Sequence, residues 1–179
     1  MALTCASERE VGAALRAFAA QHQSAHHLAY AFRIQPESEG GVGSIRPPAI
    51  VHRFSDAGEP TGTAGMPILK LLEGRDLINV CVAVIRYYGG VNLGTGGLAR
   101  AYGGTAKLAL DAAKTRPFVA MQSLALTIDY KQMDLLSRAL SICNGTILSK
   151  SFDVQVDLVV SLPAQEAENF LNRFKPYPE

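Results

Sequence analysis

Residues 77–88, LINVCVAVIRYY, leave few choices for the fold. The run is rich in Val and Ile and almost continuously apolar, which is typical of a strand buried on both faces. Its apolar part, LINVCVAVI, is far too short to span a membrane. We therefore expect a central strand in a sheet that helices cover on both sides.

Other segments show helical or strand periodicity. Ser7 and Glu10 form an S-x-x-E capping box, which predicts an amphipathic helix over 8–22. Alternation predicts a strand over 28–34, and shorter patterns predict a strand over 50–54, a loop over 35–49 and a helix over 66–74. A second helix is predicted over 98–114, with these residues on its apolar face: Leu98, Ala101, Tyr102, Thr105, Leu108, Ala109 and Ala112.

The sequence Thr115-Arg116-Pro117 is the best candidate for a domain boundary. It gives an N-terminal domain over 1–116 and a C-terminal domain over 117–179. The second domain shows the order strand, helix, strand, strand, helix, with bounds 118–130, 132–143, 145–152, 153–161 and 163–174. This order is most of a ferredoxin-like unit, whose last strand is missing because only KPYPE remains. The expected class is α+β with two domains.

Composition excludes several classes of protein. Hydrophobic residues make up 48% of the 179, so a packed core is expected, and a net charge of +1 gives no general basic field. Three scattered cysteines without a CxxC pair argue against a disulfide framework or a zinc site. The N-terminus lacks a signal-peptide core, so we expect a cytoplasmic protein without a membrane segment, and no pattern fixes its oligomeric state.

Two glycine-threonine stretches each precede a predicted helix. They are Gly62-Thr63-Ala64-Gly65 and Gly94-Thr95-Gly96-Gly97. In one interpretation Thr63 and Thr95 simply cap the helices. In the other, both helix starts face one anion, such as a phosphate, and the residues that bind it are Thr63, Gly65, Gly94, Thr95, Gly96 and Gly97, chiefly through exposed N–H groups.

The residues after the central strand extend this hypothesis. Arg86 ends the strand, where it either binds phosphate or pairs with Asp56 or Glu59. Tyr87 and Tyr88 could stack on bases. Alternatively, at least one of them lies in the core, because neighbouring residues on a strand point to opposite faces. The remaining candidates for phosphate or nucleic-acid binding are Gly89, Gly90, Arg100 and Lys107. Gly103 and Gly104, inside the helical pattern, indicate a backbone that another element approaches closely.

Asp56 and Glu59 are the candidates for catalysis. In SDAGEP they could form an acid-base pair or a magnesium site, although acidic residues beside Gly and Pro more often form turns. Adjacent His26 and His27 cannot chelate one ion together from a strand, and we expect one of them to be buried and hydrogen-bonded. No cofactor and no metal site is predicted.

The segment SDAGEPTGTAGMPIL, with NVCVAVIRYYGGVNLGTGGLARAYGG after it, closely resembles the IMPACT/YigZ family. The family signature is an acidic GEP-GTAG loop, an apolar strand ending in R-[FY]-[FY]-GG, then LGTGGL and RAYGG. HQSAHHLAYAF also resembles the early His-containing strand of that family. Ala57 stands where the family usually has a second acidic residue, and the opening strand of the family, with its K-S-R-F motif, is expected to be missing.

The resemblance implies the fold and a function. The N-terminal domain would have the left-handed βαβ fold of a small-subunit ribosomal protein, and the C-terminal domain would be similar to the last domain of elongation factor G. Eukaryotic relatives regulate translation initiation. We therefore expect a non-enzymatic, translation-associated regulator that binds RNA, the ribosome or a translation-related protein through the GTAG and RYYGG–GTGG segments. The alternative is an enzyme acting on a phosphorylated small molecule or nucleotide, with Asp56 or Glu59 as base or metal ligand.

Overall fold

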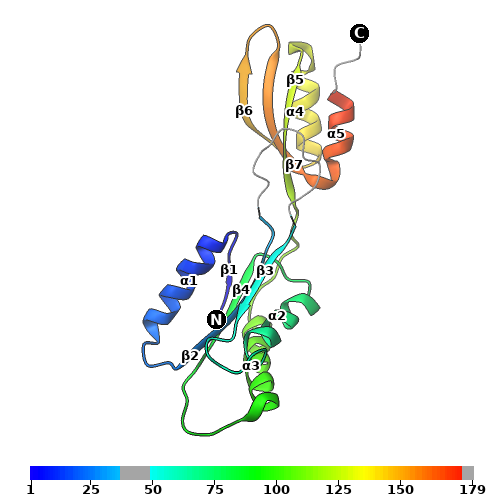
Figure 1. The fold of residues 1–179 in the computed structure, drawn as a ribbon. Coiled ribbons are helices and arrows are strands. Elements are labelled where there is room, and N and C mark those ends of the chain that lie inside the picture. The colour runs from blue at the N-terminus through cyan, green and yellow to red at the C-terminus, as the bar shows by residue number, and fades with distance from the viewer. Residues whose placement is uncertain (37–48, 175–179) are drawn as a thin grey trace. The chain divides into compact units, whose positions relative to one another are not determined.

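The structure is a computed structural model that describes residues 1–36 and 49–174 (Figure 1). It has the expected α+β class with two compact units, the first ending at Arg116 and the second beginning at Pro117. Most of the loop predicted over 35–49 lies outside the described residues. Each unit has its own sheet and its own hydrophobic core.

The sheet of the N-terminal unit has the order β1-β4-β2-β3, and all neighbouring strands are antiparallel. The strands are β1 (Ala2–Thr4), β2 (His27–Ile34), β3 (Val51–Ser55) and β4 (Val80–Arg86). The predicted central strand is confirmed, because β4 lies between β1 and β2 and its middle residues are buried.

A short strand, β1, precedes the first helix, although the opening strand of the family was expected to be missing. Leu3 pairs with Cys81 of β4, and the N-terminal ammonium of Met1 donates to the Ala83 carbonyl at 2.9 Å. A strand of three residues is too short to show alternation, so its sequence carries no signal of its own.

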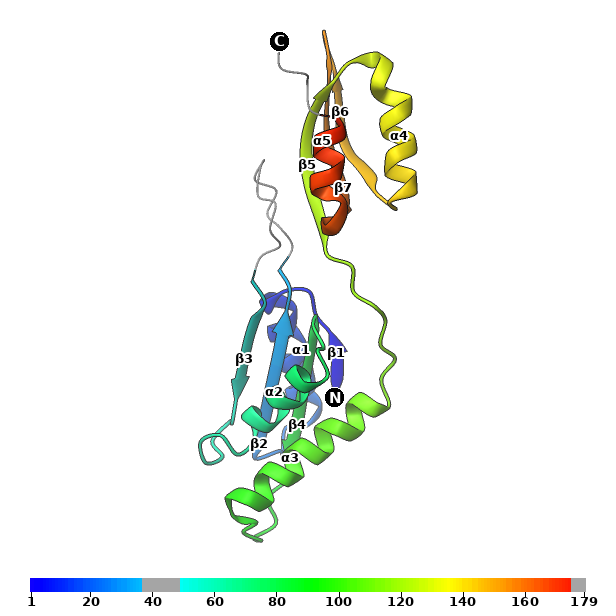
Figure 2. The same ribbon diagram turned by 90° about the vertical axis from the view of Figure 1, so that its right-hand side faces the viewer.

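Three helices cover the two faces of this sheet, as Figures 1 and 2 show. Helix α1 (Glu8–Gln21) begins at the predicted cap, where the Ser7 hydroxyl accepts from the Glu10 N–H at 3.3 Å. It packs over one face around Val11, while α2 (Gly65–Gly74) and α3 (Gly94–Asp111) pack over the other face.

Helix α3 differs from its prediction in its start and in its buried face. It begins at Gly94, so the GTGG segment is its first turn rather than a preceding loop. Its buried residues are Leu98, Tyr102, Ala106 and Leu110. Of the predicted apolar face, Ala101 and Thr105 are exposed and Leu108 is 71% exposed. Small residues fit both the buried and the exposed face of a helix. Periodicity alone therefore placed part of the predicted apolar face of α3 one position away from the residues that are buried.

The C-terminal unit has the predicted ferredoxin-like order. Its sheet has the order β5-β7-β6, and two short 3-10 turns precede its helices. The elements are β5 (Met121–Ile128), η1 (Tyr130–Gln132), α4 (Met133–Ile142), β6 (Thr146–Phe152), β7 (Val156–Pro163), η2 (Ala164–Glu166) and α5 (Ala167–Phe174). The two helices cover one face of the sheet around Leu136 and Phe170, and within 117–174 no strand follows α5.

Candidate functional site

The start of α2 already holds an anion, and that anion is Asp56. Its carboxylate accepts from the N–H groups of Gly62 at 2.8 Å, Ala64 at 2.9 Å and Gly65 at 2.8 Å. Partial burial acts to raise the pKa of Asp56, but these N–H donors outweigh it and lower the pKa below its ordinary value. The expected phosphate contact at Gly65 therefore has no free donor.

The GTAG segment packs tightly around this carboxylate. The Thr63 hydroxyl donates to the Pro60 carbonyl at 2.6 Å and does not cap α2, whose first N–H groups donate to Asp56 instead. A Cβ atom at Gly65 would lie 2.6 Å from the Ser55 carbonyl oxygen, so only glycine fits there. The pattern at 62–65 thus serves an internal turn.

Glu59 is the centre of a second buried group. Its side chain is only 4% exposed, and its Oε1 accepts from Arg86 Nη1 and from the Tyr102 hydroxyl, both at 2.8 Å. His27 Nε2 lies 3.9 Å from the same oxygen, while His27 Nδ1 donates to the Ala57 carbonyl at 2.9 Å. His27 is thus the partly buried, hydrogen-bonded histidine that the sequence predicted.

The pKa shifts in this group are those of an internal ion pair between Glu59 and Arg86. Burial tends to raise the pKa of Glu59, but the hydrogen bonds from Arg86 and Tyr102 lower it overall. Burial and the bond to Glu59 raise the pKa of Tyr102, and the carboxylate raises the pKa of Arg86 further. Arg86 also donates to the Val91 carbonyl at 3.3 Å, so its guanidinium group binds partners within the chain. Of the two alternatives for this arginine, the ion pair is therefore the one observed.

Tyr87 and Tyr88 both lie on the surface, which corrects the expectation that one of them is in the core. Strand β4 ends at Arg86, so the two residues do not alternate across the sheet. Tyr87 is 53% exposed and its hydroxyl lies 2.8 Å from Nδ1 of His22. Tyr88 is 41% exposed, its N–H donates to His26 Nδ1 at 3.1 Å, and the Arg86 guanidinium lies 5.1 Å from its ring centre.

The start of α3 is open. Leu93 occupies the cap position without a side-chain bond, so Thr95 does not cap the helix. A Cβ atom at Gly89, Gly90 or Gly94 would meet nothing within 4 Å, and at Gly96 it would meet only Arg100 Nη1 at 3.5 Å. A Cβ atom at Gly97 would lie 3.0 Å from that of Leu93, a contact inside the chain. Most of these glycines therefore leave the backbone bare toward solvent rather than make room for a neighbour.

The two helix starts do not converge on one anion. Gly103, in the middle of α3, faces Pro67 in the first turn of α2, and a Cβ atom added at Gly103 would lie 3.6 Å from the Pro67 Cβ. Gly94 lies nine residues before Gly103, which is roughly 13 Å along the helix. The close approach expected at Gly103 and Gly104 is not found, because a Cβ atom at Gly103 would make only an ordinary van der Waals contact and one at Gly104 would meet nothing within 4 Å.

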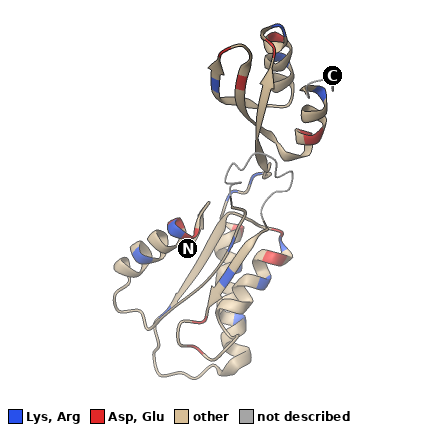
Figure 3. Cartoon of the chain, turned by 45° about the horizontal axis from the view of Figure 1, so that its top comes forward, with Lys and Arg blue, Asp and Glu red and all other residues tan. Residues whose placement is uncertain are grey.

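Cationic residues near the site differ in their availability. Lys107 pairs with Asp111 at 2.7 Å, and Asp111 also pairs with Arg75 at 2.6 Å. Arg100 is exposed and forms no ion pair within the described part of the chain. Figure 3 shows the blue Lys and Arg positions interspersed with the red Asp and Glu positions along the ribbon.

We name the following set, which is exposed apart from the half-buried Gly97, the tyrosine–glycine face. It comprises Tyr87, Tyr88, Gly89, Gly90, Gly94, Thr95, Gly96, Gly97 and Arg100. Sequence reasoning found these residues, but it missed His22 as the partner of Tyr87 and Tyr102 as the partner of Glu59. A hydroxyl on the apolar face of α3 was the available signal for Tyr102, because a buried phenol needs a partner.

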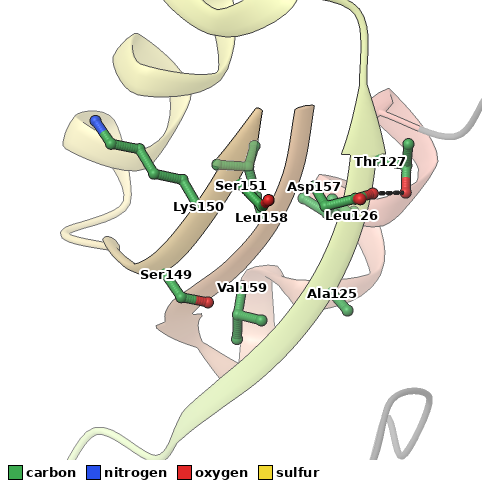
Figure 4. Close-up of a pocket in the computed structure, with 9 residues that line it drawn as sticks. All are labelled: Ala125, Leu126, Thr127, Ser149, Lys150, Ser151, Asp157, Leu158 and Val159. Carbon is green, nitrogen blue, oxygen red and sulfur yellow. Dashed lines mark hydrogen bonds between the residues drawn. The ribbon is translucent and has the colours of Figure 1, made fainter. Parts of the chain in front are cut away.

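Other site types find little support among residues 1–36 and 49–174. No group of three or more His, Cys, Asp or Glu side chains could hold a metal ion there, and no helix there is long and apolar enough to cross a membrane. A depression of about 480 Å³ on the C-terminal sheet (Figure 4) is lined by a mixture of hydroxyl, aliphatic and charged side chains, with one Thr127–Asp157 hydrogen bond of 2.7 Å. It includes none of the predicted site residues.

Fold and site together define a two-domain α+β protein whose first domain carries the glycine segments. The family model of the Impact N-terminal domain matches residues 1–110, and a domain of unknown function (DUF1949) matches residues 126–175. The chain therefore belongs to the IMPACT family.

Relatives of known sequence agree with this assignment. The chain is 40% identical over 117 residues to the IMPACT family member YigZ of Escherichia coli (strain K12), a match that covers 65% of this chain and 57% of that protein. It is 40% identical over 134 residues to an IMPACT family member of Thermus thermophilus, covering 74% of this chain and 64% of that protein. The chain thus spans less than two thirds of these curated relatives.

A solved structure shares the fold. A protein described as a hypothetical protein superposes with a TM-score of 0.66 at 32% identity, covering 97% of this chain and 80% of the other.

Proposed function

We propose that this chain is a translation-associated binding protein whose tyrosine–glycine face takes RNA, either free or in the ribosome. Membership of the IMPACT family supports the link to translation. The GTAG segment is left out of the proposed contact, because Asp56 occupies its N–H groups.

The observation that carries the proposal is the combination of two exposed tyrosine rings with an uncapped helix start. Base stacking on aromatic rings contributes about 1–3 kcal/mol per base and tolerates any sequence. The N–H groups of the first turn of α3, together with Arg100, suit a phosphate in the same strand. Bare glycine backbone at Gly89, Gly90 and Gly96 lets a bulky nucleotide come close.

The geometry favours binding over catalysis. A general base near neutral pH needs a raised pKa and access to substrate. Asp56 and Glu59 instead have lowered pKa values and accept hydrogen bonds from internal donors. The enzyme alternative therefore lacks its two candidate bases.

The test is sedimentation of the tagged chain with purified ribosomes and with single-stranded RNA, at low and at moderate salt. The informative variants are Tyr87→Ala and Arg100→Ala. Lys70→Ala is the matched control, because Lys70 is an exposed cation on α2 outside the face.

We expect both face variants to weaken co-sedimentation, and Arg100→Ala to lower the slope of log K against log salt by about one phosphate contact. Lys70→Ala should behave as wild type. A chain that stays at the top of the gradient even at low salt would exclude RNA. Binding to nuclease-treated translation factors alone would instead assign the face to a protein partner.

A further inference from the structure

The segment between β4 and α3, residues 87–92, carries both tyrosines of the tyrosine–glycine face but has little backbone support. In the described part of the chain, no backbone–backbone hydrogen bond reaches this segment. Side chains of the neighbouring elements bond to it instead, and two of these side chains are histidines. The position of each tyrosine therefore depends on a histidine.

His26 holds Tyr88 through an acceptor atom. The Tyr88 N–H donates to His26 Nδ1 at 3.1 Å, and the His26 N–H donates to the Arg86 carbonyl at 3.0 Å. These two bonds extend the contact between β2 and β4 past the His27–Arg86 pair that ends their ladder. Because a backbone N–H can only donate, Nδ1 must carry a lone pair, and the proton of the neutral ring lies on Nε2.

The ring of Tyr88 is placed by the same group of contacts. Its centre lies 6.4 Å from that of the His26 ring, in an edge-on arrangement, and 5.1 Å from the Arg86 guanidinium. The Tyr88 hydroxyl donates to Asn92 Oδ1 at 3.2 Å, within the same segment. The bond to His26 thus ties the backbone of Tyr88 to the sheet.

Protonation changes this bond because of its direction. A protonated imidazole carries an N–H on both ring nitrogens, so Nδ1 would meet the Tyr88 N–H as donor against donor. Imidazole is the side chain that ordinarily changes its charge between about pH 5 and about pH 8. His26 is exposed, so protons from the solvent reach it.

The charged and titratable groups in the contacts around His26 come from α1, β2, β4 and the turn before α2. They are His22, His27, Glu59, Arg86, Tyr87 and Tyr88. Among residues 1–36 and 49–174, the ion pairs that involve a histidine are limited to the one between His27 and Glu59. An imidazolium at position 26 therefore gains no carboxylate partner in exchange for the lost bond to Tyr88.

His22 holds Tyr87 in a way that protonation leaves intact. Its Nδ1 lies 2.8 Å from the Tyr87 hydroxyl, which can donate to a neutral ring and accept from a protonated one. His22 is also the C-cap of α1, a place where positive charge is favoured. Acid should therefore release one tyrosine and keep the other in place.

We propose that His26 is a positioning residue for RNA binding, which holds Tyr88 for base stacking when neutral and releases it when protonated. This inference rests on the proposed function. It predicts a direction that charge alone does not, because added positive charge on a protein normally strengthens RNA binding. Acid should instead remove the contribution of Tyr88.

The test is the affinity for an oligouridylate without a terminal phosphate, measured by fluorescence anisotropy at constant salt, at about pH 8 and at about pH 5.5. Neither uracil nor a phosphodiester changes its charge in this range. The informative variant is His26→Asn, whose Oδ1 can accept in place of Nδ1 and does not titrate. His52→Asn is the matched control, because His52 is exposed on β3 outside the face.

We compare the ratio of the dissociation constant in acid to that at the higher pH. This ratio should be about threefold larger in wild type than in His26→Asn, which is the effect of roughly one hydrogen bond. His52→Asn should keep the wild-type ratio. His26→Ala, which removes the acceptor, should bind weakly at both pH values. Equal ratios in wild type and His26→Asn would overturn the inference.

Nitrogen-15 spectra of the free chain give a second measurement that needs no RNA. Neutral His26 should carry its proton on Nε2, and the Tyr88 amide proton should shift along the titration curve of His26. A neutral ring with its proton on Nδ1, or a Tyr88 amide that does not follow His26, would overturn the inference. A chain that binds no oligouridylate at either pH would refute the proposed function, and the spectra would still decide whether His26 holds Tyr88.

Discussion

The starts of α2 and α3 share a Gly-Thr-x-Gly sequence and reach opposite states. At α2 the N–H groups of Ala64 and Gly65 close on Asp56, and the glycine touches backbone. At α3 no side chain caps the helix, and its first residue, Gly94, faces open space. The difference lies in what precedes each segment. Only the first segment follows an acidic residue, Asp56, that is close enough in the chain for its carboxylate to reach the N–H groups at the helix start. A helix start is an anion site only when the chain has not already supplied the anion.

The largest expected difference between the two starts is steric. Gly65→Ala should destabilise the N-terminal domain by about 3 kcal/mol, since its Cβ would meet the Ser55 carbonyl oxygen at 2.6 Å, and this backbone cannot move aside cheaply. Urea unfolding followed by circular dichroism, with the C-terminal transition as internal reference, measures this. An unchanged urea midpoint would mean that the backbone around Gly65 has as much free space as the backbone at the start of α3.

Removing the internal anion should come next. Asp56→Ala leaves three N–H groups without their acceptor and should cost about 2–3 kcal/mol, because charge-assisted bonds at a helix start are stronger than neutral ones. Thr95→Ala is the control at the other helix, where the side chain caps nothing, and should change stability by less than about 0.5 kcal/mol. Equal losses in the two variants would contradict the assignment of Asp56 as the cap.

The stability of the N-terminal domain should fall at low pH because of two carboxylates, those of Asp56 and Glu59. Folding lowers the pKa values of Asp56 and Glu59 below their ordinary values of 3.8 and 4.5. Their stabilising contribution is therefore complete above about pH 4.5 and is lost as the pH falls through the lower, folded values. Measured between pH 6 and pH 2.5, wild type should lose more stability than Asp56→Asn or Glu59→Gln. Parallel curves for all three proteins would exclude both groups as the source.

These comparisons also mark what sequence alone can predict. Periodicity and capping placed the β4 strand, α1 and the ferredoxin-like order, because each depends on local pattern. Contacts between distant segments decided the rest. The sequence allowed Arg86 either a phosphate or a carboxylate, and only the fold brings Glu59 to 2.8 Å from it. In the same way, both tyrosines became exposed because β4 ends one residue before them, and strand ends are the least certain part of any pattern.

The smallest expected effect is that of Gly96→Ala at the start of α3, a change that distinguishes an effect on stability from an effect on RNA binding. Gly96→Ala should stabilise the N-terminal domain by up to about 1 kcal/mol, because alanine is the better helix residue and the new Cβ meets only the flexible end of Arg100. If RNA approaches the bare backbone there, the same change should weaken RNA binding. Gly104→Ala provides the match, since Gly104 is exposed on the same helix, has nothing within 4 Å and lies two turns away. It should give a similar gain in stability and leave binding unchanged. Equal RNA affinity in both variants would mean that the glycine at 96 is incidental, and the contact would then rest on Tyr87, Tyr88 and Arg100 alone.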